Sequence, residues 1–320
     1  MTKIAFIFPG QGAQYPGMGQ SFFNQFPESK EIFDQANETL GFNLTKKMFE
    51  GTEEELKQTE VTQPSIFTVS CAAFKIITTQ APHIAAQCAY TAGHSLGEYS
   101  ALYATEAFDF TTGIKLVKYR GEFIQDCCKQ QPGTMAAILG CDQTELGKLC
   151  AQFTQNTEFC EMVNFNTADQ IVIAGTQNAV QSVSTQINSM PGKKAIMLSV
   201  SGAFHSRAMN QASDKMAEIL AQTKMNNTNK PVWTNVDAQP TTQAAELQKK
   251  LTQQINHPVQ WEESIKKMIQ DNTEIFIELG PGRVLSGLLR KIDRKKKILN
   301  IQDAESLEKT MQELQQTLNV

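Results

Sequence analysis

The sequence predicts an α/β fold in which helices cover a parallel sheet and a smaller α+β unit is inserted. Short apolar runs such as 3–8 (KIAFIF) alternate with segments whose apolar residues recur at helical spacing. Between about 133 and 200 the order changes to βαββαβ, which is typical of a ferredoxin-like unit. We therefore expect an α/β part formed by residues 1–130 and 201–320, and a ferredoxin-like part formed by residues 131–200.

In the first part, strands are expected where an apolar run ends in a turn, and helices where apolar residues are three or four positions apart. Prolines in a first helical turn mark two of the helix starts, Pro27 and Pro64. The expected strands cover 3–8 and 85–93, and the expected helices cover 27–41, a segment from Pro64 onward, 95–105 and 111–128.

The same criteria apply to the rest of the chain. In the inserted part they predict strands at 135–139, 161–165, 170–174 and 194–200, and helices at 143–153 and 179–190. After residue 205 they predict strands at 232–236, 274–279 and 298–301, and helices at 206–222, 241–255, 262–270, 284–292 and 303–317.

Composition excludes several classes of protein. Of the 320 residues 41% are hydrophobic, which is enough for a large core, and the net charge of −4 argues against a general nucleic-acid surface. No apolar run approaches the roughly 18 residues that a membrane span requires, and we do not expect the first residues to act as a signal segment, because their apolar run is too short. The seven cysteines contain no CxxC pair and there is no histidine cluster. We expect a cytoplasmic protein without a metal site.

The stretch GHSLG at 93–97 stands where a strand should end and a helix should begin. This is the pattern of a nucleophile elbow, in which flanking glycines permit a tight turn that exposes the serine. It makes Ser95 a candidate nucleophile, and the N–H of Leu96 a candidate donor to an oxyanion. The alternative is a glycine-flanked serine that only caps the helix.

A serine nucleophile needs a base, and the chain has four histidines. His94 lies within the turn, where its side chain should point away from Ser95. His83 is expected in a loop, and His257 precedes a proline in an extended segment. His205 follows a predicted strand and precedes a helix, so it should lie at the same sheet edge as the serine. We expect His205 to be the base; the alternative is a structural cap.

Arg120 is unusual because it lies on the apolar face of the helix expected at 111–128. A guanidinium there either extends to solvent, forms an ion pair or binds an anionic ligand such as a carboxylate. Its neighbours on that face are Leu116, Val117, Phe123 and Ile124.

The turn after the first strand, FPGQG, contains glycines but does not fit the dinucleotide-binding pattern, because Tyr15 stands where the third glycine should be. The turn can instead present a backbone N–H. Gln11 is well placed to complete an oxyanion hole together with Leu96.

Taken together, these segments resemble the malonyl-CoA:acyl carrier protein transacylases of type II fatty acid synthesis and the related acyltransferase domains of polyketide synthases. The resemblance extends over nearly the whole chain, with Ala13 replacing a commoner serine and with a less typical tail after 292. It rests on FPGQGAQ, TQPSIF, GHSLGEYSAL, KYRGEFIQ, NFN, GAFHSRAM, HPVQW and ELGPGRVLSGL, in this order.

The resemblance implies a hydrolase-like α/β part with a ferredoxin-like part, and it implies a role for each candidate. Ser95 matches the serine that is acylated, and His205 matches its base. Arg120 matches the arginine that binds the malonyl carboxylate. Gln11 and Leu96 match the donors of the oxyanion hole.

Further positions follow from the resemblance alone. Gln254 matches the residue whose backbone carbonyl orients the histidine in place of an aspartate. Gln63, Asn164 and Asn166 lie in segments that line the cleft. Phe204 matches a bulky residue that should crowd a methyl branch on the acyl group.

The resemblance also implies the substrates: malonyl-CoA and an acidic acyl carrier protein that brings its own phosphopantetheine, with no resident cofactor and a monomer as the default. The basic run 291–297 is either a solvated helix end or a patch that steers this carrier. Three other functions stay open: a discrete acyltransferase serving a polyketide synthase, a serine hydrolase or thioesterase, and a non-catalytic scaffold.

Overall fold

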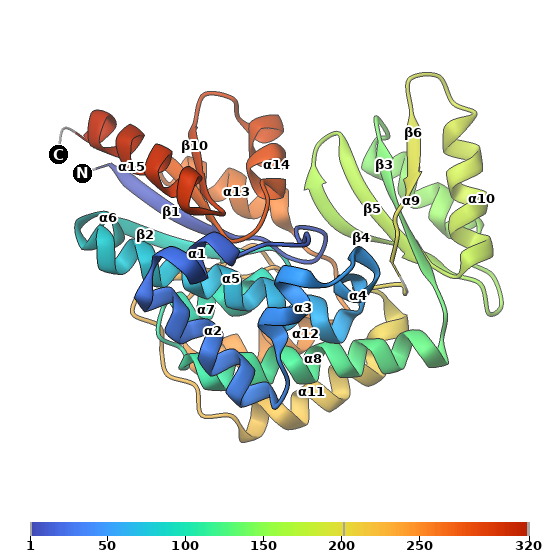
Figure 1. The fold of residues 1–320 in the computed structure, drawn as a ribbon. Coiled ribbons are helices and arrows are strands. Elements are labelled where there is room, and N and C mark those ends of the chain that lie inside the picture. Colours follow the sequence, from blue (N-terminus) through green and yellow to red (C-terminus); the bar gives the residue numbers. More distant parts are fainter. Residues whose placement is uncertain (1, 201, 319–320) are drawn as a thin grey trace.

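The computed structural model describes residues 2–200 and 202–318, and it contains two sheets (Figure 1). The larger has the strand order β10-β9-β1-β2-β7-β8, and its first five strands are parallel. Only β8 runs antiparallel, against β7. These strands are β1 (Lys3–Phe8), β2 (Cys88–Gly93), β7 (Val232–Trp233), β8 (Pro240–Thr241), β9 (Thr273–Leu279) and β10 (Lys297–Ile301).

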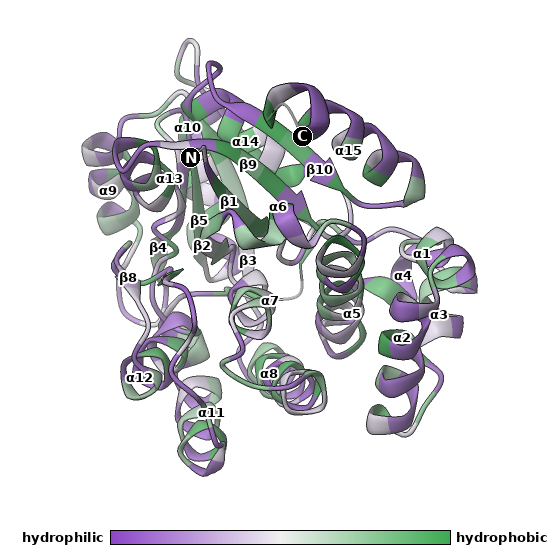
Figure 2. Cartoon of the chain, turned by 90° about the vertical axis from the view of Figure 1, so that its left-hand side faces the viewer, coloured by the Kyte–Doolittle hydropathy of each residue, from purple (hydrophilic) through white to green (hydrophobic). Residues whose placement is uncertain are grey.

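Strand β1 lies in the middle of this sheet, between β9 and β2, and both of its faces are covered. Ile4, Phe6 and Phe8 pack in the cluster that includes helices α5, α7 and α8. Ala5 and Ile7 pack on the other side, in the cluster that includes α13 and α14. This two-sided burial explains why KIAFIF is continuously apolar, and Figure 2 shows β1 and β9 as mainly hydrophobic. The helices are α5 (Thr59–Gln80), α7 (Gly97–Ala104), α8 (Phe110–Gln130), α13 (Trp261–Gln270) and α14 (Val284–Ile292).

The smaller sheet has the order β4-β5-β3-β6, and every neighbouring pair is antiparallel. With its two helices it follows the βαββαβ order expected of a ferredoxin-like unit, and it lies at the right of Figure 1. A short parallel bridge between Asn164 and Val259 joins its edge to the segment before α13. The elements are β3 (Thr134–Leu139), α9 (Gln143–Gln152), β4 (Cys160–Thr167), β5 (Gln170–Gly175), α10 (Gln177–Asn188) and β6 (Lys194–Met197).

Helix α5 begins at Thr59, so the prediction that Pro64 begins it was wrong. A proline inside a helix lacks the N–H that would bond to the preceding turn. Residues 61–73 are all buried, however, and packing of this almost completely enclosed helix outweighs the lost hydrogen bond.

The strand expected at 85–93 begins only at Cys88, because residues 82–86 form a short helix with proline at its first position. The strand expected at 194–200 likewise ends at Met197. The helix expected at 206–222 begins with a 3₁₀ turn. The remaining elements are α1 (Gln20–Gln25), α2 (Pro27–Leu40), α3 (Leu44–Glu50), α4 (Glu53–Lys57), α6 (Pro82–Ala86), the 3₁₀ turn (Arg207–Met209), α11 (Asn210–Gln222), α12 (Ala244–Gln254) and α15 (Ala304–Leu318).

Strand β7 ends at Trp233, although the sequence predicts a strand over 232–236. The chain turns back directly afterwards, with the N–H of Thr234 donating to the carbonyl of Gln239 at 3.2 Å. Because the return forms β8, the next helix begins at Ala244 rather than at 241. This turn brings its residues to the carboxyl ends of β1 and β2, where the candidate site lies.

Candidate active site

Ser95 lies in a tight turn between the end of β2 and the start of α7, and its φ of 52° is in the left-handed region. Both flanking glycines are required by close approach of backbone. A Cβ on Gly93 would come within 1.8 Å of the carbonyl carbon of Gly97, and a Cβ on Gly97 within 2.0 Å of the carbonyl oxygen of Phe8. The turn can therefore pass the end of β1 only with glycine at both positions.

His205 faces this serine from the segment that precedes the 3₁₀ turn, and its own φ is 59°. Its Nε2 lies 2.7 Å from Ser95 Oγ, and its Nδ1 lies 2.7 Å from the main-chain carbonyl oxygen of Gln254. Since a carbonyl only accepts, Nδ1 carries the proton and Nε2 is free to accept the serine proton. Burial lowers the pKa of His205 to about 3, and the cation of Arg120 adds to this effect. The imidazole is thus held neutral, as a base must be.

Arg120 is 2% exposed and reaches the serine from α8. Its Nη1 donates to Gln63 Oε1 at 2.8 Å, and its Nη2 donates to Ser95 Oγ at 3.0 Å and to Gln254 Oε1 at 3.1 Å. Its guanidinium carbon lies 5.8 Å from the ring centroid of Tyr99. Within residues 2–200 and 202–318, no carboxylate is within ion-pair distance of Arg120, and its Nε has no partner. A buried cation with an unused donor beside a nucleophile suits an anionic ligand.

Two polar residues that were not predicted from the sequence, Asn235 and Glu98, stabilise the serine turn through hydrogen bonds. Asn235 accepts from the N–H of Ser95 at 2.6 Å and donates its amide to the carbonyl of Gly93 at 2.7 Å. Its own N–H donates to Glu98 Oε2 at 3.1 Å. Glu98 is fully buried, and burial raises its pKa to about 7. The available signal was the carboxylate itself, which stands in the first turn of an otherwise enclosed helix.

A cavity of about 470 Å³ opens beside Ser95, between the carboxyl edge of the large sheet and the small sheet. The predicted residues Gln11, Gln63, Asn164, Asn166 and Phe204 line it together with Ser95, Arg120 and His205. Its apolar wall consists of Ile124, Met135, Ala137, Val172, Leu198, Val200, Ile255, Val284, Leu285 and Leu288.

The polar groups of this cavity are partly unused. In the described part of the chain, the amide N–H of Gln11 has no acceptor, and Asn164 Oδ1 is buried without a partner. The amide N–H of Leu96, directly after Ser95, has no acceptor there either, but Leu96 is fully buried and is not among the residues that line the cavity. Asn166 Oδ1 instead lies 2.9 Å from Nε2 of His94, whose ring packs 5.5 Å from that of Trp261. His94 therefore bonds to Asn166, and His83 and His257 are exposed. Of the four histidines, His205 is the one that faces Ser95.

Comparison with known proteins identifies the family. Residues 5–319 match the profile of the acyl transferase domain. The chain belongs to this family. A Bacillus subtilis protein named malonyl CoA-acyl carrier protein transacylase is 40% identical over 316 residues, which cover 99% of this chain and 98% of the relative.

Solved structures of this acyltransferase family have the same fold. The acyl-carrier-protein S-malonyltransferase from Bartonella henselae matches with a TM-score of 0.93 and 32% identity, covering 98% of this chain and 99% of that one. A malonyl-transacylase in complex with a type II PKS acyl-carrier protein matches with a TM-score of 0.92 and 32% identity, covering 98% of this chain and 100% of that one.

The described residues of the acyltransferase contain neither a membrane-spanning helix nor a group of metal ligands. None of the helices in the described ranges combines the length and hydrophobicity needed to cross a bilayer. Over the same residues, no three His, Cys, Asp or Glu side chains are grouped so as to hold a metal ion.

Proposed function

We propose that this acyltransferase moves the malonyl group from malonyl-CoA to the phosphopantetheine thiol of an acyl carrier protein, through a malonyl ester on Ser95. The observation that carries the proposal is the Arg120 guanidinium, which is buried, has no carboxylate partner among the described residues and lies 3.0 Å from the serine oxygen. Relatives that are 40% and 38% identical are named malonyl CoA-acyl carrier protein transacylases.

In the first half-reaction, Ser95 Oγ attacks the thioester carbonyl carbon while its proton passes to Nε2 of His205, 2.7 Å away. The carbon–sulfur bond breaks, CoA leaves as a thiol with that proton, and the acyl ester remains. The backbone carbonyl of Gln254 holds His205 by its Nδ1–H and so fixes the tautomer. A carbonyl in this place performs the orienting role that an aspartate has in other serine enzymes.

In the second half-reaction, the thiol of the carrier attacks the ester carbonyl as His205 accepts its proton. The ester bond breaks, and Ser95 recovers the proton from His205. In both steps negative charge develops on the carbonyl oxygen. The unpaired N–H groups of Gln11 and Leu96 are the donors that we assign to it.

Selectivity for malonyl follows because the free carboxylate of the malonyl group binds the guanidinium of Arg120. The Nε–H is free to bond to it, while Gln63 holds Nη1 at 2.8 Å. An acetyl group leaves the cation unpaired, which disfavours its binding. Phe204 lines the same cavity and crowds a methyl branch next to the thioester; one methyl is worth only about 1–3 kcal/mol, so this exclusion is partial. Asn164 and Asn166 complete the polar side of the acyl site.

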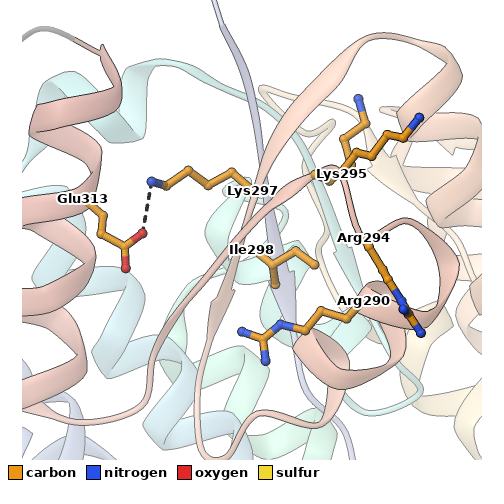
Figure 3. Close-up of a pocket in the computed structure, with 7 residues that line it drawn as sticks. Arg290, Arg294, Lys295, Lys297, Ile298 and Glu313 are labelled. Atoms are coloured by element: carbon orange, nitrogen blue, oxygen red, sulfur yellow. Dashed lines mark ion pairs between the residues drawn. The ribbon is translucent and has the colours of Figure 1, made fainter.

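The carrier protein is the second substrate, and we assign its docking to a basic surface at the end of α14 and the start of β10. A second hollow, of about 590 Å³, lies at this surface. Figure 3 shows the side chains that line it, with Lys297 paired to Glu313, and this ion pair measures 3.0 Å. Helix α14 connects it to the reaction cavity, because Val284, Leu285 and Leu288 line that cavity. The basic residues are Arg290, Arg294, Lys295, Lys296 and Lys297.

Charge reversal tests the docking surface. Lys295→Glu with Lys296→Glu should slow transfer to the carrier and reduce its salt dependence, while loading from malonyl-CoA stays unchanged. Lys224→Glu is the matched control, since this exposed lysine follows α11. Unchanged transfer rates and salt dependence would remove the surface from the proposal.

We also propose that residues 1–130 and 201–320 form one structural unit and residues 131–200 a second, with the acyl site between them. Residue 201, at one boundary, lies outside the described residues. The protein is proposed to act in the cytoplasm as a monomer. It is also proposed to need no cofactor of its own, because both substrates bring their pantetheine.

The deciding experiment is intact-mass spectrometry after brief incubation with malonyl-CoA, with Ser95→Ala as the control. The expected result is a gain of one malonyl group that is absent in the variant and is discharged by holo carrier protein. Discharge by water at the same rate would indicate a hydrolase. Comparison of carriers from fatty acid and polyketide pathways then distinguishes the two transferase roles.

A further inference from the structure

The side-chain amide of Gln254 connects the functional groups of the site. Its Oε1 accepts from Arg120 Nη2 at 3.1 Å. Its Nε2 donates to the carbonyl oxygen of Ser95 at 2.8 Å and to Glu98 Oε2 at 2.9 Å. The side chain is fully buried, so water does not compete for these bonds. One amide therefore joins the carboxylate-binding arginine, the serine turn and a buried carboxylate.

The chemistry of these partners permits only one orientation of the amide. Arg120 can only donate, whereas the carbonyl of Ser95 can only accept, and Glu98 Oε2 accepts because two N–H groups point at it. If the amide were reversed, its NH₂ would face the guanidinium and its oxygen would face two acceptors. Glu98 and the carbonyl of Ser95 together therefore hold the amide in the orientation that presents Oε1 to Arg120.

Glu98 is a costly residue at its position in the fold. It is buried in the first turn of α7, where an apolar side chain would avoid the cost of desolvating a carboxylate. Its Oε2 receives both Gln254 Nε2 and the N–H of Asn235, but Oε1 has no partner in the described ranges. Both bonds of this buried carboxylate go to residues of the site, Asn235 and Gln254, which indicates that Glu98 helps to arrange the site.

We infer that Glu98 is a positioning residue, which acts through Gln254 to hold the Arg120 guanidinium in place for the carboxylate of the acyl group. The inference rests on the proposed malonyl transfer. The Ser95–His205 pair depends on Glu98 less. The main-chain carbonyl of Gln254 holds His205, and the side chain of Asn235 holds the N–H of Ser95, whereas Glu98 accepts only from the main-chain N–H of Asn235. Glu98 therefore affects recognition of the carboxylate more than reactivity of the serine.

Two variants of similar size separate the hydrogen bond from the charge. Glu98→Gln keeps an acceptor for Gln254 and removes the charge, while Glu98→Met keeps the length and removes the acceptor. Malonyl loading should fall at least tenfold in Glu98→Met and less than threefold in Glu98→Gln. In a Gln254→Met background, Glu98→Met should cause no further loss, because its effect passes through that amide.

A second readout does not depend on transferase activity. An uncharged fluorophosphonate labels the serine, and free malonate should protect it by occupying Arg120. In Glu98→Met the labelling rate should change less than threefold, whereas the malonate concentration needed for protection should rise about tenfold. A general loosening of the fold would slow labelling as well.

The results that overturn the inference are distinct from those that overturn the proposed function. An equal fall in labelling and loading, an effect of Glu98→Gln as large as that of Glu98→Met, or additive losses with Gln254→Met would each refute the role of Glu98. A parent protein that is labelled and is protected by malonate, but is never loaded by malonyl-CoA, would refute the transfer function alone. If Glu98→Met does not fold, Glu98→Asp replaces it, since the shorter carboxylate withdraws the acceptor and should give the same losses.

Discussion

Replacing Arg120 by alanine should separate acyl groups that carry a carboxylate from those that do not. Arg120 is 2% exposed, so the pair of its guanidinium with a bound carboxylate would be almost fully desolvated. Removing one partner of a buried pair costs about 3–5 kcal/mol. Since 1.36 kcal/mol is a factor of ten, kcat/KM for malonyl loading should fall by about two to nearly four orders of magnitude. Acetyl loading loses no carboxylate pair. It is affected only through the bonds from Arg120 to Ser95, Gln63 and Gln254, and should fall by about tenfold at most.

Single-turnover loading with malonyl-CoA and acetyl-CoA, followed by intact mass, measures both rates on one sample. Lys118→Ala is the matched control, because this lysine is on the same helix, is 37% exposed and, among the described residues, forms an ion pair only with Glu122, at 3.9 Å. Circular dichroism verifies that each variant is folded. Equal losses for the two substrates would refute the role of Arg120 as the carboxylate site.

Three further outcomes are expected. Gly97→Ala should lower the free energy of unfolding by about 2–3 kcal/mol in urea melts, because its Cβ would lie 2.0 Å from the carbonyl oxygen of Phe8. Gly287→Ala is the control and should not lower it, because a Cβ there would meet nothing within 4 Å. Because His205 is the base in its neutral form and its pKa is lowered to about 3, kcat/KM for loading should show no decline near pH 6.5 as pH falls from 8 to 5; a decline with a midpoint near 6.5 would contradict this. Burial raises the pKa of Glu278 to about 7, so the folded state binds more protons than the unfolded state between about pH 4.5 and 7. This group should therefore reduce the free energy of unfolding by up to about 3 kcal/mol as pH rises through that range. Urea denaturation of Glu278→Gln at several pH values should show a smaller decline.

The alternation of strands and long helices was predictable because it depends on local apolar periodicity. Short helices were missed: α1, α3, α4 and α6 have five to seven residues each. Helices of this length are unstable alone and form because of tertiary contacts, so local pattern gives little indication of them. The start of α5 was misplaced for the same reason, since packing of the whole helix overrides the proline.

In the site, the sequence identified residues whose chemistry is unusual for their local context. Ser95 stands between two glycines, and Arg120 lies on an apolar helix face, so each is visible within one segment. Asn235 was expected inside a strand, and only the turn that ends β7 brings it to the serine, 140 positions earlier in the chain. For Gln254 the resemblance suggested a backbone carbonyl, but the bonds of its side chain depend on the packing of α12 against the site.

Both reacting residues have a positive φ, 52° for Ser95 and 59° for His205, and neither is glycine. This conformation costs about 1–2 kcal/mol at each position, so surrounding bonds must stabilise it. The N–H and carbonyl of Ser95 are held by Asn235 and Gln254, and the ring of His205 is held by the carbonyl of the same Gln254. The geometry of the reacting pair is therefore imposed by polar groups from other elements. Apolar periodicity places the sheet and its helices, but the alignment of oxygen and nitrogen at 2.7 Å depends on hydrogen bonds that no single segment contains.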